Sequence, residues 1–159
     1  MEIYFLRHGE AGKQSDWKGE DSERPLNAEG VTRMKREASA IASLGLHLEL
    51  IVTSPYVRAL QTADFVARAL GLAGSPVIDD RLSPGFSRDG LAQVLAAHSD
   101  RAALMLVGHD PDFCETISAC TGGGRVECKK GSLVRVGFDD PANLRGVLRW
   151  LIPPKLLAP

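Results

Sequence analysis

Residues 3–9 read Ile-Tyr-Phe-Leu-Arg-His-Gly, and residues 103–109 follow the same plan as Ala-Leu-Met-Leu-Val-Gly-His. Each stretch is a short apolar run that ends abruptly, which is typical of a buried strand leading into a loop. In open α/β sheets, ligands bind beyond the carboxyl ends of the strands. We therefore expect Arg7, His8 and His109 to lie at one rim of the sheet.

Helical segments are predicted beside these strands. Asn27 is a candidate N-cap for an amphipathic helix, and Gly45 supplies the signal for its end. Leu48–Val52 is predicted as the next strand. Ser54-Pro55 then predicts a helix start, with Ser54 as N-cap and proline in the first turn, and that helix ends at Gly71.

The second half of the chain alternates in the same way. Its predicted elements are a short strand at Val77-Ile78, a helix at Leu91–Ala97, a helix at Pro111–Ala119 with Asp110 as its cap, and two edge strands at Leu133–Phe138 and Val147–Ile152 that form a hairpin. This alternation predicts an α/β fold, a three-layer α/β/α arrangement around a mostly parallel, mixed sheet. Residues 1–159 show no linker, which predicts a single domain, and the proline-rich end is predicted to be a surface tail.

The composition is that of a globular protein, with 44% hydrophobic and 25% charged residues and a formal net charge of −1. Without a block of either charge, a role on nucleic acid or a membrane surface is disfavoured. Glu2 stands where a secretory signal would have basic residues, and no apolar run is long enough to span a membrane. We expect a soluble cytoplasmic protein.

The cysteines, Cys114, Cys120 and Cys128, are odd in number and lack C-x-x-C spacing. Both features argue against a disulfide framework and against a zinc site, so reduced thiols are expected. Cys114 stands near a predicted helix N-terminus, where a thiol pKa can fall, and a reactive Cys114 is the alternative.

A fourth polar group joins the predicted rim. Arg58 belongs to the helix that starts at Ser54-Pro55, and helical side chains lean toward the N-terminus of their helix. Planar guanidinium groups bind phosphate oxygens bidentately and stay charged at neutral pH. Two arginines and two histidines at one rim therefore suit a phosphoryl group.

Three motifs occur in order: Leu-Arg-His-Gly-Glu at 6–10, Ser-Pro-x-x-Arg-Ala-x-Gln-Thr at 54–62 and Val-Gly-His-x-Pro at 107–111. Together they resemble the histidine phosphatase superfamily, whose fold is phosphoglycerate mutase-like. The short length, Lys-Gly-Ser-Leu-Val at 130–134 and Trp-Leu-Ile-Pro at 150–153 resemble the bacterial SixA-type phosphohistidine phosphatases. The resemblance covers nearly the whole chain.

The resemblance implies that His8 attacks phosphorus and forms a phosphohistidine that water hydrolyses. It also implies that Arg7, Arg58 and His109 bind the phosphoryl group and stabilise its transition-state charge. No cofactor or metal is expected, because the arginines already neutralise the phosphoryl charge, and activity should survive chelators.

One departure from the superfamily pattern concerns the general acid. Mutase and phosphoesterase branches usually have a Leu-x-Glu segment whose carboxylate protonates the leaving oxygen, whereas here Leu82 is followed by Ser83-Pro84. Imidazole, with a reference pKa of about 6.5, is a better leaving group than an alkoxide and tolerates a weak or solvent-borne acid. Asp79 or Asp80 could still supply the proton from another direction.

The sequence therefore predicts a phosphatase acting on phosphohistidine in a signalling or phosphotransfer protein. A small-molecule phosphomonoesterase is the alternative enzyme. A non-catalytic phosphoprotein-binding module is the alternative from another class, although binding alone does not need the nucleophile His8. Residues 10–25 are polar and predicted to form a loop at the mouth of the site, where Glu10 would repel phosphate unless it faces outward or orients a neighbour.

Overall fold

The computed structural model describes residues 1–159 and is built around one sheet. Its strands are β1 (Glu2–Arg7), β2 (Leu50–Thr53), β3 (Val77–Ile78), β4 (Ala103–Gly108), β5 (Leu133–Phe138) and β6 (Gly146–Ile152). They stand in the order β3-β2-β4-β1-β5-β6. The pairs β1–β4, β2–β4 and β2–β3 are parallel, whereas β5 runs antiparallel to both β1 and β6. The mostly parallel, mixed sheet is confirmed.

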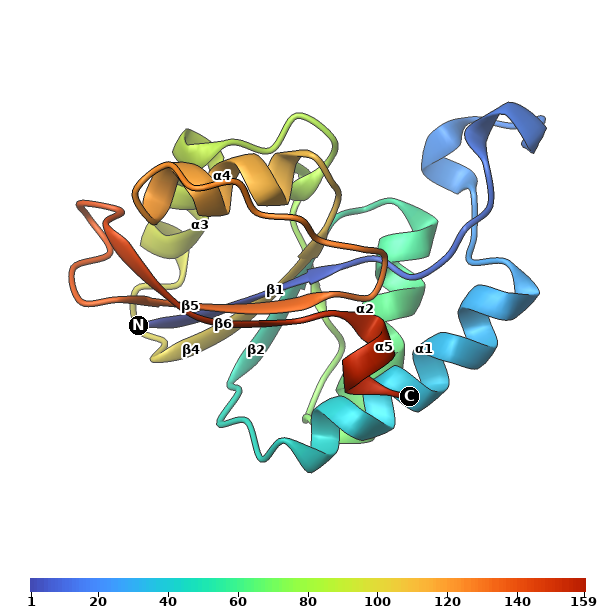
Figure 1. Ribbon diagram of the computed structural model, residues 1–159, viewed down its shortest axis with the longest axis horizontal. Helices are drawn as coiled ribbons and strands as arrows, with labels where there is room; N and C mark the ends of the chain where they lie inside the picture. The colour runs from blue at the N-terminus through green and yellow to red at the C-terminus, as the bar shows by residue number, and fades with distance from the viewer.

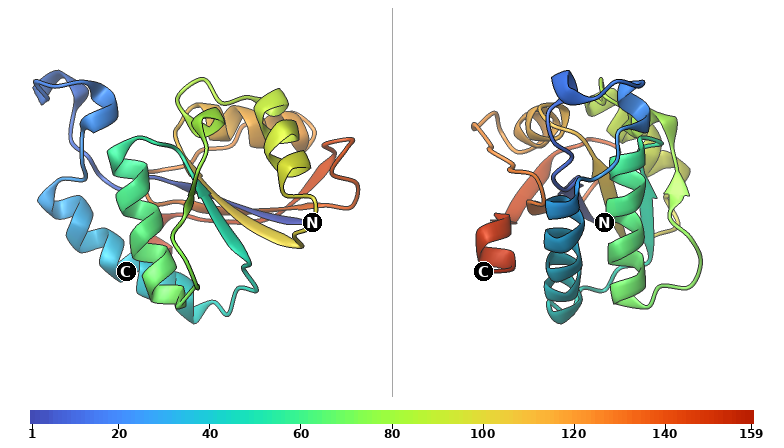
Figure 2. Two further views of the ribbon diagram at one scale, coloured as in Figure 1. Left: turned by 180° about the vertical axis from the view of Figure 1, so that it is seen from behind. Right: turned by 90° about the vertical axis from the view of Figure 1, so that its right-hand side faces the viewer.

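Helices cover both faces of this sheet (Figure 1; Figure 2). α1 (Ala28–Ser43), α2 (Val57–Leu70) and the short α5 (Pro154–Leu157) lie on one face, and α3 (Arg88–Ala97) and α4 (Asp112–Cys120) lie on the other. Each face has its own apolar core, since Leu104 and Leu106 point to one and Met105 and Val107 to the other. The three-layer arrangement follows from this alternation along fully buried strands.

The register of the two central strands brings the predicted site residues together. Leu6 pairs with Val107 and Arg7 with Gly108, so the residues that follow lie at the same carboxyl edge. The backbone N–H of His8 donates to the carbonyl of Gly108 at 3.1 Å, which extends the ladder by one bond. This pairing places His8 and His109 side by side at the rim.

Local signals set the start of α1 and the end of α2 as predicted. Asn27 caps α1, with its side-chain oxygen accepting the Gly30 N–H at 2.7 Å. Gly30 itself is required, because a Cβ there would lie 1.9 Å from the Glu10 carbonyl oxygen. Gly71 ends α2 in the left-handed region, with φ 63°.

Both proline-associated cap predictions are wrong by one or two residues. α2 begins at Val57 with Tyr56 as N-cap, and α4 begins at Asp112 with Pro111 as N-cap. The Ser54 hydroxyl is bonded to His109 and the Tyr56 N–H, and the Asp110 carboxylate faces Arg7. Both side chains therefore contact residues at the rim of the sheet, and neither belongs to the N-cap residue of its helix.

Three further expectations are corrected. The first strand after α1 is shorter than predicted, beginning at Leu50. β5 is not an edge strand, because it pairs with both β1 and β6, and only β6 lies at that edge. The C-terminal segment is not a free surface tail, since Pro154 and Leu157 are buried in the short helix α5, which packs near α1.

None of the helices has the length and apolar character to span a bilayer.

Candidate active site

The rim carries a group of four side chains that we call the strand-end pocket: Arg7, His8, Arg58 and His109. His8 and His109 follow β1 and β4, and Arg58 is the second residue of α2. The two imidazole rings lie 5.2 Å apart, centroid to centroid. The structure thus brings together all four residues that the sequence predicted to meet.

Hydrogen bonds fix the tautomer of His8. Its Nδ1 lies 2.7 Å from the Gly9 carbonyl oxygen, which can only accept, so Nδ1 carries the proton. Its Nε2 receives the Nε–H of Arg58 at 3.3 Å, and a guanidinium can only donate. The Nε2 lone pair therefore faces the side of the ring where Arg58 lies.

Burial keeps both histidines neutral. Desolvation is the main reason that the pKa of His8 falls well below its usual value, and His109, Arg58 and Arg7 lower it further. Desolvation, followed by the charge of Arg58, lowers the pKa of His109 to about 4. At neutral pH His8 is an unprotonated base of the kind that nucleophilic attack requires.

Three residues outside the predicted set support the pocket. The Ser54 hydroxyl lies 2.9 Å from His109 Nε2, and the Tyr56 ring packs against the same imidazole at 5.0 Å. The Thr62 hydroxyl accepts the Gly9 N–H at 3.1 Å and donates to the Arg58 carbonyl at 2.8 Å. Ser54 and Thr62 belong to the quoted 54–62 motif, which was the sequence signal available for them.

Arg58 also holds the loop beside the pocket. Its NH2 group lies 2.9 Å from the Asp21 carboxylate, and its NH1 group donates to the Asp21 carbonyl at 2.7 Å. The same carboxylate accepts from Arg24 Nε at 2.9 Å, and Arg24 NH1 bonds the carbonyls of Ala11 and Gly12. Residues 10–25, with 3-10 turns at Gln14–Asp16 and Asp21–Glu23, form the predicted loop. Nothing in the sequence pattern pointed to Asp21.

Arg7 is held by a different set of residues from the set that holds Arg58. Its NH1 group donates to the Cys128 carbonyl at 2.6 Å and lies 3.5 Å from the Asp110 carboxylate. Its Nε is buried without a partner, as is His109 Nδ1. Buried polar atoms without a partner are unusual in proteins, so these two atoms mark places where a ligand atom would be stabilised.

Of the three carboxylates considered as acids or as obstacles, Asp79 and Glu10 have other partners. Asp79 accepts from the backbone and guanidinium of Arg81, and these contacts lower its pKa. Asp80 is exposed at the start of a 3-10 turn. Burial alone would raise the pKa of Glu10, but hydrogen bonds from Lys130 and the Gly12 N–H outweigh it and lower the pKa. Glu10 thus orients a lysine.

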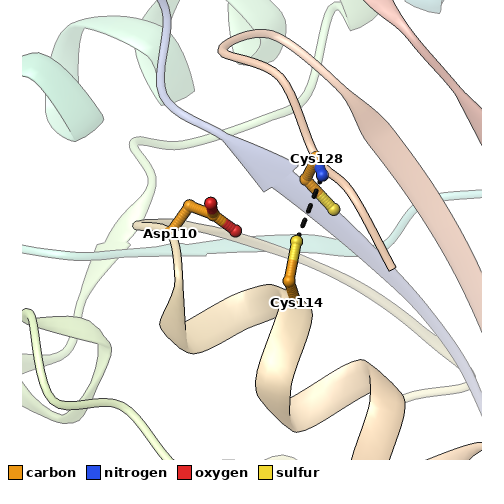
Figure 3. Close-up of side chains that lie close together, drawn as sticks. All are labelled: Asp110, Cys114 and Cys128. Carbon is orange, nitrogen blue, oxygen red and sulfur yellow. Dashed lines mark hydrogen bonds between the residues drawn. The ribbon is translucent and has the colours of Figure 1, made fainter. Parts of the chain in front are cut away.

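The cysteines match the main expectation from the sequence but not its alternative. All three are free and buried, as expected, but burial, Asp110 and Cys128 raise the pKa of the Cys114 thiol, so the alternative of an activated thiol is wrong. Cys114 and Cys128, distant in sequence, meet beside Asp110 (Figure 3). The Cys128 N–H donates to Cys114 Sγ at 3.1 Å. Sequence spacing gave no sign of this cluster.

Comparison with known proteins gives the family. The histidine phosphatase superfamily (branch 1) model matches residues 3–83. A curated uncharacterised protein from Picosynechococcus is 39% identical, with 96% of this chain and all of that protein covered. Phosphohistidine phosphatase SixA of Escherichia coli is 24% identical, with 97% of this chain and 94% of SixA covered.

Solved structures agree on the fold. The structure of the protein histidine phosphatase SixA complexed with tungstate superposes with a TM-score of 0.86 at 23% identity, over 98% of each chain. A mycobacterial glucosyl-3-phosphoglycerate phosphatase also superposes, with a TM-score of 0.73 at 17% identity, over 94% of this chain and 97% of its own. With the family model spanning half of the chain, this protein belongs to the histidine phosphatase superfamily.

Proposed function

We propose that this protein is a phosphohistidine phosphatase that removes the phosphoryl group from a histidine of a signalling or phosphotransfer protein, with His8 as nucleophile. The observation that carries the proposal is the state of His8. Its Nδ1 proton is held by the Gly9 carbonyl, its pKa is far below neutrality, and its Nε2 lone pair faces Arg58. A module that only binds phosphate would not need such a group.

In the first step, His8 Nε2 attacks phosphorus and the bond from phosphorus to the substrate imidazole breaks. The departing imidazole takes a proton from solvent. In the second step, water attacks the phosphorus on His8, inorganic phosphate leaves, and the water proton passes to solvent. The Arg58 Nε–H bonds the attacking nitrogen at 3.3 Å, so as phosphorus approaches it exchanges this bond for one to a phosphoryl oxygen.

His109 would act as a neutral donor. Ser54 Oγ accepts the Tyr56 N–H at 3.3 Å, and we assign the Ser54 proton to the bond with His109 Nε2 at 2.9 Å. His109 then carries its proton on Nδ1, the buried atom that has no partner in the protein. A phosphoryl oxygen would satisfy this donor, and Arg7 Nε would be satisfied in the same way.

The leaving group supports phosphohistidine over an alkyl phosphate. Pro84 stands where other branches of the superfamily have a carboxylic acid, and Leu82 packs near Gly108 at the rim. Asp79 is a poor substitute for that acid, because its pairing with Arg81 keeps it ionised at neutral pH. Imidazole leaves without strong protonation, whereas an alkoxide does not.

The test compares three substrates that differ in leaving group: a phosphohistidine protein, an aryl phosphate and an alkyl phosphate. We expect phosphate release from the first two, with the alkyl ester at least about 100-fold slower in kcat/KM, since a general acid contributes on that order. His8→Ala should abolish release and the acid-labile phosphoenzyme. His47→Ala, at an exposed histidine, is the matched control.

Rapid turnover of the alkyl ester, lost on Asp79→Asn or Asp80→Asn, would instead identify a small-molecule phosphomonoesterase. Tight binding of the phosphoprotein with neither release nor a phosphoenzyme would identify a binding module. Release that persists in His8→Ala would remove His8 from the mechanism.

A further inference from the structure

Next to the strand-end pocket, Asp110, Cys114 and Cys128 point toward a common centre (Figure 3). One carboxylate oxygen and the two sulfur atoms all lie within 4.8 Å of one another. Asp110 lies two residues before α4, Cys114 lies in the first turn of α4, and Cys128 comes from the segment that leads into β5. We propose that these three side chains form a binding site for a thiophilic divalent cation such as Zn²⁺.

The geometry suits such an ion. Zinc binds thiolate sulfur at about 2.3 Å and carboxylate oxygen at about 2.0–2.2 Å, so tetrahedral ligands stand roughly 3.5–3.8 Å apart. Ligand atoms already within 4.8 Å need only small side-chain movements to reach these separations. Asp110 Oδ1 is buried without a hydrogen-bond partner, so one oxygen of the carboxylate is available.

The cluster is reachable from solvent. Asp110 and Cys114 line a hollow of about 630 Å³ whose other charged residues are Glu115, Arg125 and Glu127. Three protein ligands would leave the fourth position open toward this hollow, where water can enter. The acidic side chains of this hollow outnumber its one basic side chain, Arg125, which favours the approach of a cation.

The charges also balance. On binding, each thiol loses its proton to the buffer, so two thiolates and one carboxylate carry three negative charges against the two positive charges of the ion. The remaining negative charge faces Arg7, whose NH1 group lies 3.5 Å from the Asp110 carboxylate. The guanidinium therefore stabilises the loaded site rather than opposing it.

The site is coupled to Arg7 through two of its ligands. Asp110 pairs with the Arg7 guanidinium, and the Cys128 carbonyl accepts its NH1 group at 2.6 Å. Drawing Asp110 and Cys128 toward an ion shifts both partners of Arg7. Because small displacements of groups that position the substrate are costly, the ion acts as an inhibitor. This coupling, unlike the binding itself, rests on the proposed function.

Binding is tested on reduced protein kept under nitrogen, so that a disulfide cannot form in place of the metal site. Co²⁺ is the spectroscopic probe and Zn²⁺ the competitor. We expect one Co²⁺ per chain, with thiolate-to-cobalt charge-transfer absorption that Zn²⁺ removes. Cys114→Ser and Cys128→Ser should each weaken binding by more than the roughly 10- to 100-fold that the loss of an outer-shell partner costs, and each should diminish that absorption. Asp110→Asn should weaken binding but keep the absorption, because both thiolates remain.

Two variants keep the test decisive. Cys120→Ser replaces the third buried cysteine, which lies outside the cluster, and should bind as the unmodified protein does. His8→Ala separates the cluster from metal capture by the histidines of the pocket and should also retain binding. Binding unchanged in both Cys114→Ser and Cys128→Ser, binding lost in His8→Ala, or no thiolate absorption would each overturn the proposal. Circular dichroism verifies that every variant is folded.

Activity is the separate readout for the coupling. One equivalent of Zn²⁺ should lower kcat/KM at least threefold in the unmodified protein and in Cys120→Ser, and a chelator should restore it. Cys128→Ser should be insensitive to the same addition. Metal binding without inhibition would overturn the coupling to Arg7 and leave the site standing, whereas a failure of the proposed phosphatase activity would not affect the Co²⁺ measurement.

Discussion

The strand-end pocket and loop 10–25 are neighbours, yet they are held by different forces. Three of the four pocket side chains, His8, Arg58 and His109, are 4–6% exposed and follow or pack on buried elements. The two 3-10 turns of the loop contain no buried residue, and the bonds of Asp21 and Arg24 tie the loop down. The pocket is thus held by burial and the loop by a few polar bonds, and mutations should be able to separate the two.

Arg58 belongs to both regions, so its loss should have the largest effect. Arg58→Ala removes a donor beside His8 Nε2 and the partner of Asp21. We expect kcat/KM to fall by about 100- to 1000-fold, as for the loss of a transition-state donor, and the loop to become sensitive to proteolysis. Steady-state kinetics and limited proteolysis measure the two effects.

Arg24→Ala is the control for this change, because Arg24 anchors the loop but makes no bond to the pocket histidines. It should increase proteolysis of the loop with a much smaller effect on kcat. Equal losses of kcat in the two variants would mean that the loop and the pocket are one unit.

Gly30 joins the two regions where α1 packs on the Glu10 backbone. A Cβ at this position would lie 1.9 Å from the Glu10 carbonyl oxygen, so Gly30→Ala must push α1 away from the chain that follows His8. We expect the free energy of unfolding to fall by about 2–3 kcal/mol in urea titrations. Gly124→Ala, where a Cβ would meet nothing within 4 Å, should stay within about 0.5 kcal/mol. Similar stabilities of the two variants would mean that the contact is relieved easily.

Asp21 sharpens the comparison, because it lies in the loop but pairs with a pocket residue. Asp21→Asn keeps the shape of the side chain and removes the charge shared by Arg24 and Arg58. We expect KM for a phosphohistidine protein to rise by about 10-fold, the equivalent of ~1.4 kcal/mol, with kcat and the kinetics on an aryl phosphate changed much less. A fall in kcat on both substrates would assign Asp21 to the pocket instead.

How far the sequence could anticipate this structure depends on how local each signal is. The apolar runs of β1 and β4 and the Asn27 cap are encoded within a few residues, and they were predicted. The bond of Asp21 to Arg58 joins residues 37 positions apart, and Cys114 meets Cys128 across 14, with no periodicity that could reveal either contact.

Some local signals were misread because tertiary contacts redirected them. Ser54 has the residue type of an N-cap, yet its hydroxyl is bonded to His109, which comes from another strand. The alternating pattern of residues 133–138 fits either an edge or an inner strand, and only pairing with β1 on one side and β6 on the other decides between them.

The smallest predicted change in stability concerns Glu37, a buried carboxylate of α1. It lies against Gly131, whose N–H donates to the Arg7 carbonyl. Burial raises the pKa of Glu37 from 4.5 to about 6, and Arg33 and Arg36 offset only part of this shift. The folded protein therefore binds more protons than the unfolded chain between these values, so the free energy of unfolding falls as pH rises through this window.

Glu37→Gln removes that titration. A shift of this size is equivalent to about 2 kcal/mol, and we expect the variant to recover roughly 1 kcal/mol at pH 7.5, since the amide must also be desolvated. Near pH 4, where the native carboxyl is protonated, the variant should be less stable by about 1 kcal/mol, because only the extra cost of desolvating the amide remains there. Glu29→Gln, at an exposed position of the same helix, should change neither value. A variant less stable at pH 7.5 would show that the attraction of Arg33 and Arg36 for the carboxylate more than offsets the cost of burying its charge. The ionised Glu37 would then stabilise the fold next to Arg7.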